Sequence, residues 1–454
     1  MKIVIIGDGK VGNALTRRLA KEGHSLTVID SSPDALRNAM NVADILTING
    51  NGAAMSIQLE AGVDKADLLI AVTSTDEMNL FCCLTAKKLG AKHTIARVRN
   101  PEYSEQLFLM QKELGLSMTV NPEQSAAREI SRILRFPSAL KIDTFAQGRA
   151  EIIEIKINEG NPLDGMPIWS LQQKYTVKVL ICAVQRDEEV YIPSGDFVLR
   201  AGDKLSMTAF PADAVRFCKS IGVFKQKIET VMIVGGGKIT YYLTRLLDQM
   251  GMEVKIIEIN KERCRYLADA LPDARIIHGD GTDQDLLLEE GIEHTDAFVA
   301  ITDNDEENLL VSMYATSKNV EKTITKINRT SLIEVLGGMG IDSVVSPKNL
   351  ISDKIVRYVR AMQNSYDISS METLHRMVNN KVEALEFIIK DEIPGLTGKK
   401  LMELKIRPNT LIGCITRHGR VIIPGGATTI EKDDSVIIVT TNEGINNLTD
   451  ILEK

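Results

Sequence analysis

The hydrophobic residues of this chain fall into short, strand-length runs separated by amphipathic stretches. KIVII at residues 2–6 and TVMIV at 230–234 are examples of such runs. Through residues 1–136 and 229–364 the runs alternate with helical patterns of about 10 to 15 residues. This alternation predicts βαβ units on a parallel sheet in both segments.

Residues 140–222 and 372–454 have a different pattern, in which a strand is followed by a Pro/Gly turn, a short helix and a hairpin. Polar, Pro- or Gly-containing junctions are expected near 136–148 and 364–380. The predicted fold class is α/β, with two doubly wound parallel-sheet domains, each followed by a small α+β domain. The expected domains are 1–136, 140–222, 229–364 and 372–454.

The chain is an internal duplication. The segment KIVIIGDGKVGNALTRRLAKEGHSLTVID (2–30) is repeated as TVMIVGGGKITYYLTRLLDQMGMEVKIIE (230–258), with every position displaced by 228 residues. Further on, ADLLIAVTSTDEMNL (66–80) is matched by TDAFVAITDNDEENLL (295–310). The small domains repeat as well, so each half of the chain carries one large and one small domain.

Composition and charge exclude several classes of protein. The 454 residues are 44% hydrophobic and carry a net charge of −7, which argues against disorder and against a nucleic-acid footprint. The apolar runs are far shorter than the roughly 20 residues of a membrane helix.

Because the N-terminus runs directly into a strand, no signal peptide is expected, and we predict a cytoplasmic protein. The six cysteines show no CxxC spacing, so buried inert thiols are expected and no metal site.

A glycine-rich turn follows the first predicted strand and opens a helix. Gly7 permits the tight turn, Gly9 lets the backbone approach a pyrophosphate, and Gly12 allows the helix to pack closely on the strand. Asp30 ends the next strand, where a carboxylate accepts hydrogen bonds from ribose hydroxyls and repels a 2′-phosphate. NAD or an adenine nucleotide is favoured over NADP, although a vacant site on the same fold remains an alternative. The predicted cofactor-binding residues here are Gly7, Asp8, Gly9, Lys10, Val11, Gly12 and Asp30.

The second copy departs from this pattern at one position, because Thr240 stands where the third glycine is expected. Its Cβ should hold the helix slightly further from the strand and weaken pyrophosphate binding. The second site is therefore either a nucleotide site or a vestigial or differently occupied one. Its predicted residues are Gly235, Gly236, Gly237, Lys238, Ile239 and Glu258.

Further loops should reach the same crevices, because ligands lie along the carboxyl ends of parallel strands. These loops add Asn51, Gly52, Thr73 and Ser74 in the first copy, and Asp280, Gly281 and Thr302 in the second. After the fifth strand come Arg97 and Arg99, answered by Lys326. A cation there could contact a phosphate, and a solvated surface arginine is an equally good interpretation.

No catalytic constellation is evident in the sequence. The small domains contain no clustered His, Lys and Asp, and no Walker, HExxH or GxSxG motif occurs. We therefore expect no enzyme activity. The competing interpretation is an NAD-dependent oxidoreductase whose small domains bind substrate.

The glycine fingerprint, then GNGA or GDGT, then AVTSTDEMN or AITDNDEEN, then a small module with a PSGD or PGGA hairpin, resembles the RCK (KTN) domain family. Two copies in one chain are similar to the tandem regulatory subunits of potassium-uptake systems. The resemblance implies binding of NAD(H) and ATP/ADP. In the first copy it assigns the nucleotide contacts to Gly7 to Val11, Asp30, Thr73, Ser74 and Arg97, and in the second to Gly235 to Ile239, Glu258, Thr302 and Lys326. Within that pattern, Lys326 replaces a planar guanidinium with a point charge, which is not a conservative change.

The resemblance also implies assembly and partners. It predicts a homo-oligomeric, tetrameric ring at the inner face of the membrane, bound to a potassium-translocating subunit and not to nucleic acid. The apolar helices after Pro122 and Pro347 are candidates for subunit contacts, or are ordinary core helices. A regulator of a different cation channel or efflux system is the remaining alternative.

Overall fold

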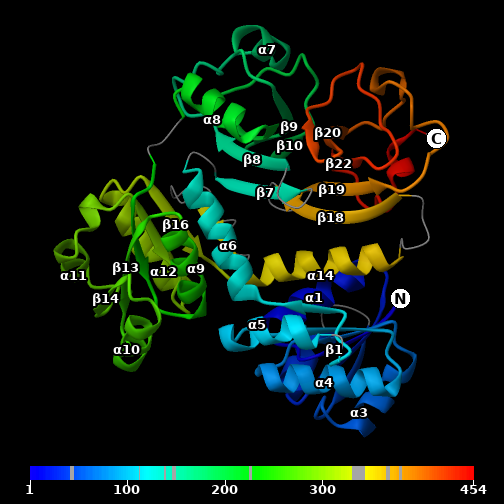
Figure 1. The fold of residues 1–454 in the computed structure, drawn as a ribbon, viewed down its shortest axis with the longest axis vertical. Coiled ribbons are helices and arrows are strands. Elements are labelled where there is room, and N and C mark those ends of the chain that lie inside the picture. The colour runs from blue at the N-terminus through cyan, green and yellow to red at the C-terminus, as the bar shows by residue number, and fades with distance from the viewer. Residues whose placement is uncertain are drawn as a thin grey trace. The chain divides into compact units, whose positions relative to one another are not determined.

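A computed structural model describes residues 1–40, 45–111, 113–137, 140–145, 150–223, 227–329, 343–363, 369–377 and 381–453. Figure 1 shows the helices and strands with the labels used below. Among the described residues, every helix is too short or too polar to cross a bilayer.

The first large module carries a six-stranded parallel sheet. Its strands are β1 (Lys2–Ile6), β2 (Ser25–Asp30), β3 (Leu46–Asn49), β4 (Leu68–Ala71), β5 (His93–Arg97) and β6 (Met118–Val120). Its helices are α1 (Lys10–Lys21), α2 (Pro33–Met40), α3 (Met55–Glu60), α4 (Asp76–Leu89), α5 (Pro101–Met110) and α6 (Pro122–Arg135).

The strand order in this sheet is β3-β2-β1-β4-β5-β6. Strands are thus added on one side of β1 up to β3 and on its other side from β4 onward, so the strand order reverses between β1 and β4. These two strands are parallel neighbours, with Ile3 opposite Leu68. In open parallel sheets, ligands bind in the crevice at the carboxyl ends of the strands on either side of such a switch point. The glycine turn after β1 opens onto this crevice.

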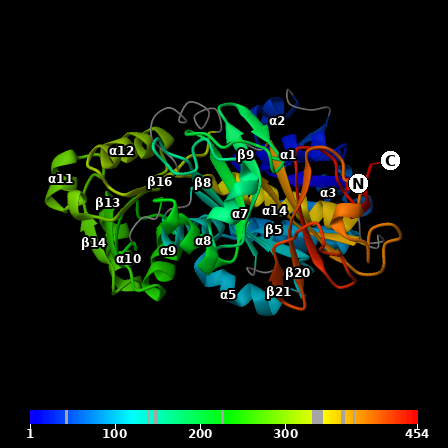
Figure 2. The same cartoon turned by 90° about the horizontal axis from the view of Figure 1, so that it is seen from above.

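The third module, counted along the chain, repeats this architecture. Its strands are β12 (Thr230–Val234), β13 (Glu253–Glu258), β14 (Arg275–His278), β15 (Ala297–Ala300), β16 (Lys322–Lys326) and β17 (Ser343–Val345), in the order β14-β13-β12-β15-β16-β17. Its helices are α9 (Lys238–Gln249), α10 (Lys261–Ala270), α11 (Gln284–Glu289), α12 (Asp305–Ser317) and α14 (Pro347–Gln363). Figure 2 shows α9 and α10 on one face of the sheet and α11 and α12 on the other.

The two small modules each contain a five-stranded antiparallel sheet. The first is built from β7 (Lys141–Phe145), β8 (Ala150–Lys156), β9 (Val179–Arg186), β10 (Glu189–Tyr191) and β11 (Lys204–Ala209), with α7 (Leu171–Lys174) and α8 (Pro211–Ser220). The second is built from β18 (Ser369–Met377), β19 (Val382–Ile389), β20 (Thr410–Arg417), β21 (Arg420–Ile422) and β22 (Ser435–Thr440). The predicted fold class is confirmed: two doubly wound parallel sheets, each followed by a small α+β module.

The two segments in which junctions are expected, 136–148 and 364–380, each contain a strand. β7 lies in the first segment and β18 in the second, and each pairs antiparallel along the edge of its small sheet. The sequence SSMETLHRM has few β-branched residues, so its strand conformation follows from pairing with β19 rather than from intrinsic propensity.

Corresponding modules pair in space. One compact unit holds residues 1–131 and 229–356, and the other holds 132–228 and 357–454. In the first unit, Arg18 of α1 forms an ion pair with Asp353 of α14, and the Tyr242 hydroxyl donates to the carbonyl of Arg99 at 3.1 Å. Asp353 lies on the helix after Pro347 that was a candidate for subunit contacts. That helix therefore contacts the other copy within the same chain.

Candidate functional site

Both glycine turns have a conformation that excludes side chains at their first position. The φ angles of Gly7 and Gly235 are +96° and +103°, which L-residues rarely adopt. A Cβ on Gly7 would also lie 3.0 Å from the backbone nitrogen of Thr73, and one on Gly235 would lie 2.9 Å from that of Thr302. The turn after the first strand is thus packed against the loop after the fourth.

The third glycine position differs between the copies as the sequence indicates. A Cβ on Gly12 would lie 1.9 Å from the carbonyl oxygen of Gly7, so no side chain fits there. Thr240 is nevertheless fully buried at the equivalent place, and its hydroxyl donates to the carbonyl of Gly235. The start of α9 must leave more room than the start of α1, which supports the expected displacement of the helix.

The space in front of both helix starts is open. A Cβ on Gly9 or on Gly237 would meet no atom within 4 Å. Both glycines are N-cap residues, and neither helix has a side-chain cap. Uncapped backbone N–H groups with the positive end of the helix dipole suit an anionic ligand such as a pyrophosphate.

The acidic residue after the second strand is held by the glycine turn itself. The two carboxylate oxygens of Asp30 accept hydrogen bonds from the backbone N–H groups of Asp8 at 2.7 Å and Ser32 at 2.8 Å. Glu258 repeats this arrangement with Gly236 at 2.6 Å and Asn260 at 2.7 Å. Each oxygen keeps a second lone pair, so both carboxylates can still accept ribose hydroxyls.

Asp8 is turned inward rather than toward a ligand. Its side chain is 5% exposed and accepts a hydrogen bond from the Asn13 amide at 3.2 Å. Burial raises the pKa of Asp8 above its ordinary value, and the negative charge of Asp30 adds to the effect. Its ionised form is therefore less favourable in the folded protein than in the unfolded chain.

We expect Asp8→Asn to increase thermal stability in a pH-dependent way. Since the folded pKa is raised, the wild type loses stability relative to the variant as pH rises through that pKa. The melting midpoints should coincide at acidic pH, where Asp8 is protonated in both states, and separate toward neutral pH. Asp34→Asn, at an exposed position of the same module, is the control. A constant difference across the pH range would contradict the assignment.

The third module contains a cavity of about 980 Å³ at the carboxyl ends of its strands. This volume is at the upper end of the range for small-molecule and cofactor sites. Of the residues predicted for this copy, Gly235, Gly236, Gly237, Glu258, Asp280, Gly281 and Thr302 line it. Lys238, Ile239 and Lys326 do not line it, and the Ile239 side chain is buried in the core.

Arg263 of α10 is a site residue that the sequence interpretation missed. Its guanidinium donates to the carbonyls of Gly236 at 2.5 Å and Gly237 at 3.1 Å, and it lies 4.6 Å from the ring centre of Tyr266. Both side chains line the large cavity. The first copy has Ala35 and Asn38 at these positions, so the repeat alignment itself showed a cation and an aromatic ring present in one copy only.

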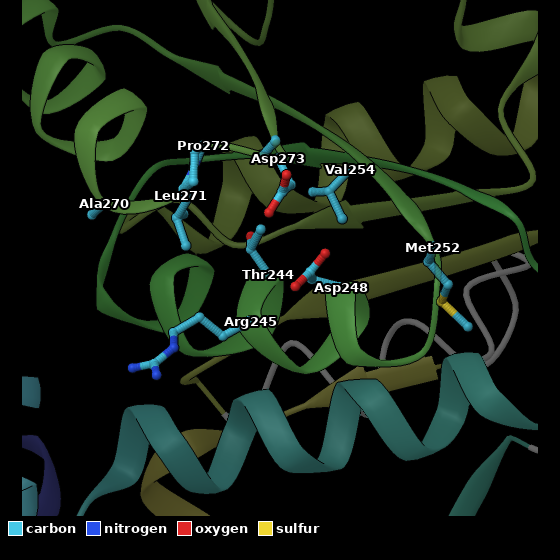
Figure 3. Close-up of a pocket in the computed structure, with 10 residues that line it drawn as sticks. Thr244, Arg245, Asp248, Met252, Val254, Ala270, Leu271, Pro272 and Asp273 are labelled. Atoms are coloured by element: carbon cyan, nitrogen blue, oxygen red, sulfur yellow. The ribbon is translucent and has the colours of Figure 1, made fainter.

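A smaller cavity of about 170 Å³ lies elsewhere in the third module. It is formed where β13 begins and α9 ends (Figure 3). The glycine turn lies at the other end of the strands. The two cavities share no lining residue.

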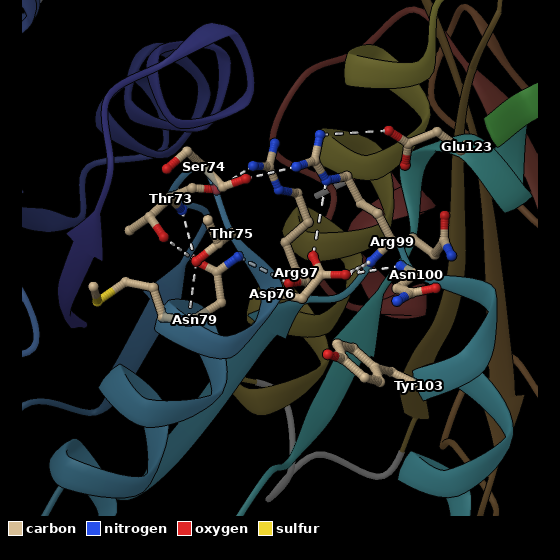
Figure 4. A network of polar contacts seen from close by, with 12 residues as sticks. Thr73, Ser74, Thr75, Asp76, Asn79, Arg97, Arg99, Asn100, Tyr103 and Glu123 are labelled. Carbon is tan, nitrogen blue, oxygen red and sulfur yellow. Dashed lines mark hydrogen bonds and ion pairs between the residues drawn. The ribbon is translucent and has the colours of Figure 1, made fainter. Parts of the chain in front are cut away.

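An asparagine on the helix after the fourth strand organises each crevice. The Asn79 side chain accepts from the backbone N–H of Thr73 at 2.6 Å and from its hydroxyl at 2.8 Å, and donates to the carbonyl of Arg97 at 2.9 Å (Figure 4). Asn308 accepts from the N–H of Thr302 at 2.7 Å and donates to the carbonyl of Lys326 at 3.1 Å. The same amide thus ties the loops after the fourth and fifth strands together in both copies.

Arg97 and Arg99 lie over the loop that contains Thr73 and Ser74. Arg97 donates to the carbonyl of Thr73, and Arg99 donates to the carbonyl of Ser74 at 2.6 Å (Figure 4). Burial lowers the pKa of Arg97, with a further contribution from the charge of Arg99. Neither arginine is a freely solvated surface residue, and contact of Arg97 with a phosphate stays a prediction.

Lys326 has a different environment from Arg97. Its ammonium group forms an ion pair at 3.2 Å with Asp303, a residue that lines the large cavity. The cation is therefore neutralised by a neighbour in the second copy.

The loops after the third strands of the two modules are also similar. The Asn51 and Asp280 side chains each accept a backbone N–H within their own loop, at 3.0 and 2.9 Å. Gly52 and Gly281 pack on the first strand of their modules.

Thiol and metal chemistry receive no support from the described residues. All six cysteines are buried and unpaired, and burial raises the pKa of Cys82 to about 12 and that of Cys182 to about 11. Across the described part of the chain, no three His, Cys, Asp or Glu side chains form a group that could hold a metal ion.

The fold and the repeated turns define a tandem Rossmann-type protein with two dinucleotide-type crevices. The TrkA-N domain family matches residues 3–122 and 231–347, and the TrkA-C domain family matches residues 152–222 and 385–453. The chain therefore belongs to the TrkA family, and the resemblance inferred from the motifs is confirmed.

Curated relatives match over nearly the full chain. The Trk system potassium uptake protein TrkA homolog of Archaeoglobus fulgidus is 34% identical over 99% of this chain and 100% of its own length. Trk system potassium uptake protein TrkA of Vibrio alginolyticus is 30% identical over 98% of this chain and 96% of its own.

Solved structures share the fold at lower identity. The GsuK RCK domain has a TM-score of 0.64 and 18% identity, and the match covers 97% of this chain and 92% of that one. The GsuK channel bound to NAD has a TM-score of 0.63 and 19% identity, with coverage of 97% and 77%.

Proposed function

We propose that this protein is the nucleotide-sensing regulatory subunit of a potassium-uptake system. The observation that carries the proposal is the hydrogen-bond scaffold repeated at both crevices, in which a carboxylate holds the glycine turn and keeps free lone pairs for a ribose. The potassium-uptake assignment is supported by relatives of that name that span the whole chain.

The proposed ligands are NAD(H) and ATP or ADP, bound at the carboxyl edges of the two parallel sheets. Solved GsuK structures of the same fold carry NAD in one case and ADP in another, which supports these two ligand classes. In the first crevice the pyrophosphate would lie before Gly9, the ribose on Asp30, and Arg97 near a phosphate. In the second, Glu258 would bind the ribose, and Arg263 would turn from the glycine carbonyls to a phosphate.

Regulation follows from differential binding and needs no chemical step. If a nucleotide binds one conformation of the assembly tenfold more tightly than another, occupancy shifts the equilibrium by about 1.4 kcal/mol per site. Several sites in one closed assembly add these contributions. The assembly we propose is a tetrameric ring on the cytoplasmic face of the membrane, attached through the potassium-translocating subunit.

The test is titration of NADH, NAD, ATP and ADP into the full-length protein, alone and together with the membrane subunit of a Trk system in vesicles. We expect calorimetry to detect binding, and potassium flux to depend on which nucleotide is present. Asp30→Ala/Glu258→Ala, which removes both ribose-binding carboxylates, should lose both responses. Steady oxidation of NADH with a small substrate would favour the oxidoreductase instead, and flux that ignores all four nucleotides would contradict sensing.

A further inference from the structure

The smaller cavity of the third module has the features of a second, separate ligand site. Its floor is formed by the last turns of α9, and its walls by Met252, Val254 and the segment from Ala270 to Ala274 (Figure 3). It opens at the amino ends of the strands, whereas the glycine turn lies at their carboxyl ends. A ligand here would not compete with a nucleotide.

A buried hydroxyl without a partner belongs to a residue that lines this cavity. Thr244 is 4% exposed, and its side-chain oxygen has no hydrogen-bond partner. Thr16 occupies the equivalent position of α1, and its hydroxyl donates to the carbonyl of Gly12 at 3.0 Å. Buried hydroxyls are nearly always hydrogen-bonded, and one that is not indicates a missing partner. In the third module that partner can be a ligand, because Thr244 lines the cavity.

Two exposed carboxylates line the same cavity. Figure 3 shows the side chains of Asp248 and Asp273 directed toward Thr244, from α9 and from the loop after α10. In the part of the chain that the structure describes, neither carboxylate makes an ion pair or hydrogen bond. The nearby guanidinium of Arg245 is directed to Tyr241, with a hydrogen bond of 3.3 Å to the phenol. The first copy has Ala20 in place of Asp248, so it lacks this charge.

We propose that this pocket binds a small alkylammonium ligand. The ammonium group would lie between the two carboxylates and donate its third hydrogen bond to the Thr244 hydroxyl, since an ammonium offers three donors. The alkyl part would lie on Met252, Val254 and Leu271, the apolar side of the cavity.

The apolar walls favour an organic cation over a metal ion. Magnesium needs six oxygen ligands in near-ideal octahedral geometry, and calcium needs six to eight. Thr244, Asp248 and Asp273 offer five side-chain oxygens at most, all on one side of a cavity whose other side is hydrocarbon. A cavity of about 170 Å³ also leaves room for several carbon atoms beyond one charged group.

The test is calorimetric titration of butylamine and 1,4-diaminobutane into the full-length protein at low, fixed ionic strength, without nucleotide. We expect saturable binding of at least one amine to the wild type. Asp248→Asn/Asp273→Asn should weaken it by about tenfold or more, because charge-assisted hydrogen bonds are lost. Thr244→Val keeps the shape of the side chain and removes only the hydroxyl, so a smaller loss is expected. Asp269→Asn removes one charge from α10, outside the cavity, and should bind as the wild type does.

Parallel titrations with magnesium, calcium and potassium chlorides decide the kind of cation. Binding of a metal salt that Asp248→Asn/Asp273→Asn abolishes, with no amine binding, would overturn the alkylammonium assignment. Equal amine affinity in the wild type and in Asp248→Asn/Asp273→Asn would overturn the site itself. Circular dichroism of each variant separates loss of binding from loss of fold. Because no nucleotide is present, failure here leaves the proposed sensing function untouched, and the reverse also holds.

Discussion

Replacing Gly12 with alanine is expected to lower the melting midpoint of the protein and to abolish nucleotide binding at the first crevice. The added methyl carbon would lie 1.9 Å from the carbonyl oxygen of Gly7. The clash is with backbone, so no rotamer change relieves it, and α1 must move away from β1. Overpacking of this kind costs about 1–3 kcal/mol. Differential scanning calorimetry and nucleotide titration measure the two effects.

Gly9→Ala is the matched control for this change. It adds the same methyl group three residues earlier, where a Cβ meets no atom within 4 Å. The melting midpoint should therefore stay close to that of the wild type. Nucleotide affinity should still fall, because the methyl group would occupy the space proposed for the pyrophosphate. If Gly12→Ala melted as Gly9→Ala does, the tight contact between α1 and the turn would be wrong.

Asp30→Ala is expected to weaken nucleotide binding at the first crevice by about 10- to 100-fold. Hydrogen bonds to a charged acceptor contribute about 1.5–3 kcal/mol, and the ribose would lose its acceptor. The structure adds a second cost, since the N–H groups of Asp8 and Ser32 also lose theirs and the turn loosens.

Asp30→Asn separates the loss of the ribose acceptor from the loss of the hydrogen bonds that hold the turn. It keeps one acceptor oxygen for the turn and removes the negative charge that disfavours a 2′-phosphate. We expect its affinity for NAD to lie between those of the wild type and Asp30→Ala, and its preference for NAD over NADP to shrink. Calorimetry with both dinucleotides checks this. Unchanged NAD affinity in Asp30→Ala would contradict the placement of the ribose.

The parts of the fold that depend on local pattern could be predicted from the sequence. The strands and helices of the large modules follow from hydrophobic periodicity. Because the chain is duplicated, the same pattern predicts them in both copies. The positions of Gly7 and Gly12 could also be derived, because the turn that they form has a fixed steric requirement.

Features that depend on contacts distant in sequence could not be predicted. Asn79 recurs as Asn308, but its role depends on the loops after the fourth and fifth strands lying side by side, which only the assembled sheet establishes. Arg263 reaches back 26 residues to Gly237 in the same way. Strand β18 forms because an unpaired edge of β19 is available, which nothing in its own residues indicates.

Carrying both copies in one polypeptide has an evolutionary consequence. In an assembly of single-copy chains, every mutation appears in all crevices at once. Here a codon change affects one crevice and spares the other, as Thr240 against Gly12 and Lys326 against Arg97 illustrate. The two halves are thus free to specialise: one can retain an ancestral ligand while its twin acquires a new one, within a single gene product.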